Sequence, residues 1–351
     1  MNTVRIVSII FERFAAAQRQ SEQSRWQRWF QRVVLAFAAG LVLASAAVAQ
    51  DYPTRQIILI VPFPAGGSTD AIARIVSEPM RQALGQTVVV QNVTGAGSTI
   101  GVGRAIQAAP DGYTLSVGNW TSHVGASAVY PVSWNILMDL EPVAMLSTTT
   151  LIIAGRTGLP VNDGKELIAW LKANPDQATA ATVGAGSGAH ICGIYFEQKT
   201  GTRFRYVPYR GGAPVMADLM ANQVDLFCGE ASQMLGHFRA GRIKPLVVMS
   251  KSRWSPLPEV STMEEVGASD THITFWQGLW APKGTPRDII AKLNDAVVRA
   301  FGDPVVIKRL TELGQSIPPR EQLTPDALGA YHKSEIDKWW PLIKGANIKA
   351  E

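Results

Sequence analysis

The chain has 351 residues, 46% of them hydrophobic, which is enough for two globular lobes with ordinary apolar cores. Its formal charge of +5 comes almost entirely from the first 49 residues, which hold six Arg and two Glu and leave a net charge of +1 on the rest. A body so close to neutral, without clustered Lys or Arg, excludes a nucleic-acid-binding surface.

The first 49 residues have the three parts of a secretory signal peptide. A basic segment precedes the apolar run Val33–Leu43, and Ala47–Ala49 matches the small-x-small cleavage pattern. An uncleaved membrane anchor is the alternative, but the 17 residues from Val33 to Ala49 fall short of the ~20 that a spanning helix needs. We therefore expect export to the periplasm, with cleavage before Gln50.

A strand, a glycine-rich bend and a helix start come next along the chain. The apolar run Ile57–Val61 predicts the strand, and the segment Pro62–Asp70, the first loop, leads into a helical pattern. Backbone N–H groups at a helix start lack intrahelical acceptors and carry a partial positive charge, which suits a carboxylate or a phosphate. Gly66 and Gly67 let the backbone come close to such a ligand.

The helix after the first loop is expected over Thr69–Leu84, with Gly85 as its end. Pro79 lies inside this helix and predicts a kink or a break near Ser77–Glu78. Beyond it, the pattern predicts a strand at Thr87–Gln91, a short helix through Gln107 and a strand at Tyr113–Val117.

A second glycine-rich segment, Thr182–His190 (the second loop), has the same shape, because it follows an apolar segment and precedes a helix-like run. Two such loops suggest one anion held between two α/β lobes. The long β-branched run Val143–Gly155 is expected to cross from one lobe to the other, and Pro245–Ser250 to cross back.

Strands that alternate with helices predict mostly parallel sheets, and so an α/β protein with a ligand cleft between two lobes. We expect lobe 1 to comprise residues 51–150 and 250–351, and lobe 2 residues 151–249, after a signal peptide of residues 1–49. The tail is helical: Thr285–Asp288 has the pattern of a capping box, and Asp303-Pro304 and Thr324-Pro325 mark two further helix starts.

The sequence lacks the common cofactor-binding and catalytic motifs. The segment after Gly95 lacks the dinucleotide fingerprint, because Ile100 stands where its third glycine belongs. Ala185 and Ala189 occupy the glycine positions of a nucleophile elbow. The five histidines show no metal-binding spacing. We therefore expect no cofactor, no metal and no catalysis.

Several candidate residues keep two interpretations each. Asp70 either complements the dipole of its own helix or recognises an amino or hydroxyl group of a ligand. His190 either donates to a ligand carboxylate or holds the second loop by a backbone contact. Trp120, Tyr209 and Trp276, near predicted strand ends, either pack in the core or wall the cleft.

Two cysteines, Cys192 and Cys228, fit an oxidising compartment without forming a disulfide framework. They either pair with each other or remain buried free thiols, since both lie in apolar stretches.

Several short motifs follow one another in order from about Tyr52 to the C-terminal helices. They are Pro62–Asp70 with Ala73-Arg74, Gly95–Gly97, Pro110–Leu115, Val207–Gly211, Leu257–Val260, and Trp276–Gly278 with Ala281-Pro282. In these motifs the chain resembles the extracytoplasmic solute receptors of tripartite tricarboxylate transporters, also called Bug-type receptors.

This resemblance implies a fold similar to that of type II periplasmic binding proteins, with a cleft between two α/β lobes. Members bind small carboxylates through the two glycine-rich loops and ordered waters, and deliver them to a membrane permease. The candidate ligand-binding residues are Phe63, Gly66, Gly67, Ser68 and Asp70 on the first loop, Gly186, Ser187 and His190 on the second, and Thr121 and Tyr209 beside them.

The sequence departs from the family pattern at three places. Ser98 replaces the glycine that usually follows Gly95–Gly97, and Ala189 stands where a hydroxyl residue often precedes His190. Cys228–Glu230 replaces a Phe-Asp-Asn-like segment. The last two departures lie near the expected cleft, so we expect the far end of the ligand to be recognised differently.

We thus expect a monomeric periplasmic receptor that captures a small carboxylate and passes it to permease subunits. A small-molecule enzyme on the same scaffold is one alternative, and a ligand-sensing partner of a signalling receptor is another. The ligand stays open among dicarboxylates, tricarboxylates, amino acids and aromatic acids.

Overall fold

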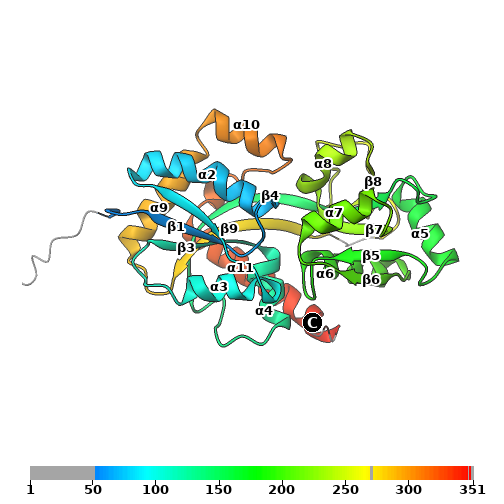
Figure 1. Ribbon diagram of the computed structural model, residues 1–351, viewed down its shortest axis with the longest axis horizontal. Coiled ribbons are helices and arrows are strands. Elements are labelled where there is room, and N and C mark those ends of the chain that lie inside the picture. Colours follow the sequence, from blue (N-terminus) through cyan, green and yellow to red (C-terminus); the bar gives the residue numbers. More distant parts are fainter. Residues whose placement is uncertain (1–51, 269–271, 347, 349–351) are drawn as a thin grey trace, which may run out of the picture. The chain divides into compact units, whose positions relative to one another are not determined.

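A computed structural model describes residues 52–268, 272–346 and 348 of the chain (Figure 1). The expected signal peptide and its cleavage site before Gln50 lie outside these residues, so processing stays a prediction. Within the described part, no helix combines the length and the apolar character needed to cross a membrane. From Pro53 onward the described chain forms one compact unit.

The first half of the sheet is built on parallel strands. β1 (Ile57–Val61) lies between β2 (Val88–Asn92) and β3 (Thr114–Asn119) and pairs in parallel with both, as the alternation of strands and helices predicts. β9 (Thr274–Pro282) adds an antiparallel neighbour to β3. β1 is almost entirely buried, which is why its five residues are all aliphatic.

The second half repeats this parallel arrangement. β5 (Thr179–Thr182) lies between β6 (Arg205–Pro208) and β7 (Leu226–Glu230) and pairs in parallel with both. The carboxyl ends of parallel strands meet at one edge of a sheet, where α/β proteins bind their ligands. The second loop, which follows β5, therefore lies at the same edge as Glu230, the last residue of β7.

One long strand belongs to both halves. β4 (Leu140–Arg156) pairs antiparallel with β9 as far as Thr150 and with β7 from Leu151 onward. The strand expected at Pro245–Ser250 is β8 (Ile243–Val248), but it does not span both halves as the expected return crossing would. It pairs with β4 only over Ile152–Arg156, in the second half, and β9 pairs with the Leu140–Thr150 part, in the first (Figure 1). The sheet thus consists of two groups of three parallel strands, β2-β1-β3 and β7-β5-β6, which antiparallel strands join.

Helices flank both halves. In Figure 1, α2 and α9 lie on one side of β1, β3 and β9, while α3 and α11 lie on the other, and α5 to α8 surround the second half. Their bounds are α2 (Ser68–Leu84), α3 (Thr99–Ile106), α4 (Ala126–Val129), α5 (Gly164–Ala173), α6 (Gly188–Thr200), α7 (Gly212–Met220), α8 (Ala231–Arg239), α9 (Arg287–Ala300), α10 (Pro304–Glu312) and α11 (Pro325–Gly345).

Two local helix predictions need correction. α2 continues through Pro79 without the predicted break, because residues on both sides of the proline, such as Val76 and Met80, are buried in the core and hold the helix in place. Thr285 does not cap α9: its hydroxyl donates to the Pro282 carbonyl at 2.8 Å, and the N-cap position is Pro286.

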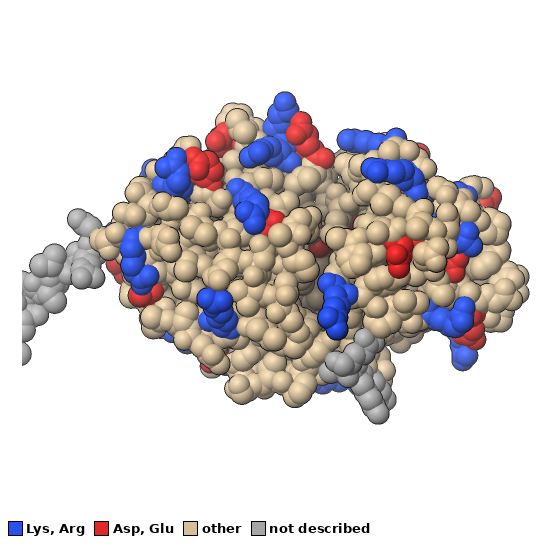
Figure 2. All heavy atoms as spheres, in the orientation of Figure 1, with Lys and Arg blue, Asp and Glu red and all other residues tan. Residues whose placement is uncertain are grey.

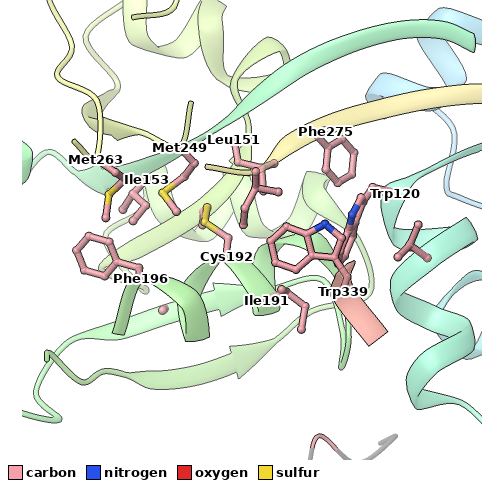
Figure 3. Close-up of a cluster of buried hydrophobic side chains, with 14 of the residues drawn as sticks. Trp120, Leu151, Ile153, Ile191, Cys192, Phe196, Met249, Met263, Phe275 and Trp339 are labelled. Carbon is pink, nitrogen blue, oxygen red and sulfur yellow. A yellow bond between two sulfur atoms is a disulfide. The ribbon is translucent and has the colours of Figure 1, made fainter. Parts of the chain in front are cut away.

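A single cluster of buried apolar side chains extends under both halves. It includes Trp120 beside the end of β3, Phe275 on β9, Leu151 on β4 and Phe196 on α6 (Figure 3). Within it a disulfide joins Cys192 of α6 to Cys228 of β7, with the two Cα atoms 6.2 Å apart. The pairing that the sequence left open is therefore made, and it links the helix after the second loop to the strand that ends at Glu230.

Candidate functional site

The first loop connects β1 to α2, and the buried carboxylate of Asp70 holds it in shape. This carboxylate accepts hydrogen bonds from the N–H of Gly66, the guanidinium of Arg74 and the amide of Asn92, each at 3.0 Å. The Asn92 amide also donates to the carbonyl of Phe63 at 3.0 Å. Asp70 is thus directed at its own loop and at β2, so its main contribution in this structure is to fix the loop.

These contacts also set the charge of Asp70. Burial by itself raises the pKa of Asp70, but the hydrogen bonds from Arg74, Gly66 and Asn92 outweigh burial and hold this pKa below its usual value. A carboxyl whose pKa is lowered by folding stabilises the folded state above its unfolded-state pKa. That stabilisation is lost as the pH falls through the folded-state pKa.

Asp70→Asn is expected to lower the free energy of unfolding by about 2 kcal/mol at pH 7, since a hydrogen bond to a charged group contributes about 1.5–3 kcal/mol. The difference from the wild type should begin to shrink below about pH 4, where Asp70 of the unfolded chain becomes protonated, and should vanish as the pH falls through the lowered folded-state pKa. Urea unfolding of the wild type and the variant between pH 7 and pH 3 measures this difference in the free energy of unfolding. Asp295→Asn, at an exposed carboxylate paired with Arg299, is the control. A difference that does not change with pH would contradict this account.

The start of α2 presents backbone donors toward the space beyond β1. Ser68, Thr69 and Asp70 are its first residues, so their N–H groups have no acceptor in the preceding turn of the helix. The Thr69 hydroxyl accepts from the Asn119 amide at 3.0 Å, which fixes this helix start against the end of β3. Gly67 is the N-cap and has an ordinary extended backbone, with φ −78°.

The second loop leads into α6 and has fewer open donors than the first. Ser187 is the N-cap, and its hydroxyl accepts from the N–H of His190 at 3.3 Å. The N–H of Gly188 donates to the hydroxyl of Thr121 at 3.0 Å. Gly186 has φ +72°, and a Cβ there would lie 2.5 Å from Val129, so this turn requires glycine.

His190 and Tyr209 are positioned mainly by contacts within the second half. The half-buried ring of His190 packs against Tyr206 with 4.8 Å between centroids, and burial lowers its pKa, so the ring is neutral at pH 7. Its Nδ1 is buried and has no hydrogen-bond partner among the described residues. The Tyr209 hydroxyl donates to Asp218 at 2.7 Å, and burial together with this bond raises the pKa of Tyr209 to about 12.

The first loop faces the helix starts of the second half at close range. A Cβ on Gly211, just before α7, would lie 3.4 Å from Pro64, and one on Gly67 would lie 3.8 Å from the amide nitrogen of Gln233 in α8. Together with the bond between Thr121 and Gly188, these approaches define a narrow cleft. Figure 2 shows the visible face hollowed along the boundary between the two halves.

Two residues that are not among the candidate ligand-binding residues from the sequence, Glu230 and Gln277, contact each other inside this cleft. Glu230, at the end of β7, accepts a hydrogen bond from the Ser68 hydroxyl at the start of α2. It also accepts from the amide of Gln277 on β9 at 3.3 Å. The sequence drew attention to Glu230 only as a departure from a family pattern. It presented Gln277 only as part of the motif Trp276–Gly278 and gave no sign of its role, because the antiparallel pairing of β9 is not visible in a local pattern.

One histidine contacts two serines, although the sequence gave no nucleophile–base pair. The ring of His123 lies 2.9 Å from the Ser122 hydroxyl and 3.3 Å from the Ser116 hydroxyl, and it stacks on Trp280. All three polar residues are fully buried, so a substrate cannot reach them. No group of His, Cys, Asp and Glu suited to hold a metal ion occurs in the described part of the chain.

Comparison with known proteins assigns the chain to a family. Residues 72–348 match the family model described as the tripartite tricarboxylate transporter family receptor. The chain belongs to this family. BugT of Bordetella pertussis is 33% identical over 321 residues, which cover 90% of this receptor and 98% of BugT.

Solved structures of similar proteins agree with this assignment. MatC from Rhodopseudomonas palustris, with bound malate, is 33% identical to the receptor with a TM-score of 0.79, and the match covers 83% of this chain and 100% of MatC. A second R. palustris protein, with adipate, is 29% identical with a TM-score of 0.80, and covers 85% of this chain and 99% of its own. The receptor is thus a solute-binding protein with the two-lobed α/β fold.

Proposed function

We propose that the receptor captures a small carboxylate in the cleft and delivers it to the membrane permease of a tripartite tricarboxylate transporter. The observation that carries this proposal is the start of α2. Its backbone donors open toward the cleft, and the first loop that presents them is fixed by Asp70. Malate and adipate, the acids bound to two relatives, are of the class that such a helix start attracts.

The proposed ligand contacts come from both loops. On the first loop, Gly66, Gly67 and Ser68 offer backbone and hydroxyl donors with Phe63 beside them, and Asp70 acts by fixing the loop. On the second, Gly186 and Ser187 shape the helix start and His190 offers a neutral ring. Thr121 ties the second loop to lobe 1, and Tyr209 supports the start of α7.

We also propose the setting in which this happens. The Ala47–Ala49 pattern favours a cleaved leader and a periplasmic receptor, and the disulfide between Cys192 and Cys228 suits an oxidising compartment. Lobe 1 comprises residues 51–150 and 250–351, and lobe 2 residues 151–249. The exchange of β4 partners between Thr150 and Leu151 supports the first boundary. The receptor acts as a monomer.

A thermal-shift panel of dicarboxylates, tricarboxylates, amino acids and aromatic acids tests the proposed function. An acid present at about 100 times its dissociation constant adds about 2.7 kcal/mol to the free energy of unfolding. For a chain of this size, such a gain raises the melting temperature by several degrees. A panel in which no acid shifts the melting temperature would overturn the proposal.

A further inference from the structure

We propose that Glu230 determines the class of ligand: the captured acid carries a hydrogen-bond donor or a positive charge at the end that meets Glu230, and a second carboxylate there is rejected. This inference rests on the proposed function, because it concerns the far end of a ligand whose carboxylate lies at the start of α2.

The position of Glu230 brings it into contact with both walls of the cleft. It ends β7 in lobe 2, yet its partners Ser68 and Gln277 belong to α2 and β9 in lobe 1. β7 is the parallel neighbour of β5, so Glu230 shares the edge of the sheet from which the second loop extends. A ligand held between the two loops therefore lies next to this carboxylate.

The groups around Glu230 supply acceptors and few donors. The Ser68 hydroxyl and the Gln277 amide nitrogen already donate to Glu230. The side chain of Gln277 is fully buried, and its other amide atom, the acceptor Oε1, has no hydrogen-bond partner among the described residues. Ser147, the β4 residue opposite Gln277, has a buried hydroxyl that is likewise unpartnered there. Gln277 and Ser147 are both fully buried, so of these three side chains only the half-buried Glu230 is open to a ligand donor.

The charge of Glu230 also favours a positively charged group on the ligand. Burial raises the pKa of Glu230 to about 7, and the hydrogen bond from Ser68 opposes this rise only in part. Both described partners, Ser68 and Gln277, are neutral, so neither offsets its negative charge. A second carboxylate could bind here only with Glu230 protonated, whereas an ammonium group would pair with the charged form.

The experiment compares acids that differ only at the far end. Three pairs have matched length: succinate with β-alanine, glutarate with 4-aminobutyrate, and adipate with 5-aminovalerate. Titration calorimetry at pH 7 gives the dissociation constant for each acid with the wild type, Glu230→Gln and Glu230→Asp. Glu230→Gln keeps the shape and removes the charge, and the Gln277 amide can turn over to accept from it. Glu141→Gln, which removes a charge from an ion pair with Lys283, is the matched control.

The wild type is expected to bind at least one amino acid about tenfold or more tightly than its paired dicarboxylate. Glu230→Gln should abolish or reverse this preference, while Glu230→Asp and Glu141→Gln should retain it. Binding of the amino acid should also release protons from Glu230, seen as a heat that depends on the buffer, and Glu230→Gln should remove this release.

Two results would overturn the inference while leaving the proposed function in place. One is a wild type that prefers the dicarboxylates. The other is a preference for the amino acids that Glu230→Gln leaves unchanged. Absence of binding of all six acids to the wild type would overturn the inference alone if another acid of the thermal-shift panel binds, and together with the proposed function if none does.

Discussion

Replacing both cysteines, as Cys192→Ala with Cys228→Ala, is expected to lower the free energy of unfolding by about 2–4 kcal/mol. The disulfide closes a loop with a sequence separation of 36 residues, and without it the unfolded chain gains the conformations that this closure excludes. Both side chains are buried in the core beneath the sheet, so alanine leaves only a small cavity. Urea unfolding of the wild type and the double variant measures the difference.

The reduced wild type provides the control for this experiment. Dithiothreitol should move the unfolding midpoint of the wild type toward that of the double variant and leave the variant itself unchanged. If the two proteins unfold at the same urea concentration in the absence of reductant, the disulfide contributes nothing to stability. The tie between α6 and β7 would then be incidental.

Gly67→Val is expected to raise the dissociation constant of the best acid in the thermal-shift panel about a hundredfold, which corresponds to about 2.7 kcal/mol. The backbone of Gly67 is extended, and a Cβ there would meet Pro64 and Gln233 at 3.6 and 3.8 Å, distances of ordinary contact. The fold should therefore survive. The two methyl groups of valine would occupy the space between the lobes, where the donors of α2 open.

Gly236→Val is the matched control for this substitution. Gly236 lies exposed on α8, and a Cβ there meets nothing within 4 Å. Both variants should melt close to the wild-type temperature without ligand, and titration calorimetry should show a weakened affinity in Gly67→Val alone. Wild-type affinity in Gly67→Val would show that the ligand does not approach the start of α2.

Features that depend on local sequence were predictable. The parallel strands β1 and β3, the left-handed Gly85 at the end of α2, and the caps Asp303 and Thr324 follow from apolar runs, turn residues and capping chemistry. Each of these is decided by neighbours within a few residues, so a sequence pattern is enough to identify it.

Features that depend on distant partners were not predictable. The role of Asp70 is decided by Asn92, which is 22 residues away on β2 and whose amide reaches the carboxylate only when β1 and β2 pair. Similarly, Pro245–Ser250 and Thr274–Pro282 are both apolar runs of strand length. Both pair with β4, and their neighbours in the sheet, rather than their composition, determine which half of β4 each one lies beside.

The sharing of β4 has a consequence for how the molecule loses its structure. Because this strand pairs with β9 in the first half and with β7 and β8 in the second, neither half keeps a complete sheet or its apolar cover when β4 separates. The two lobes are therefore one cooperative folding unit, although the cleft divides them. Ligand bound at the edge of either lobe stabilises residues far from the site, including the strand ends most remote from the cleft.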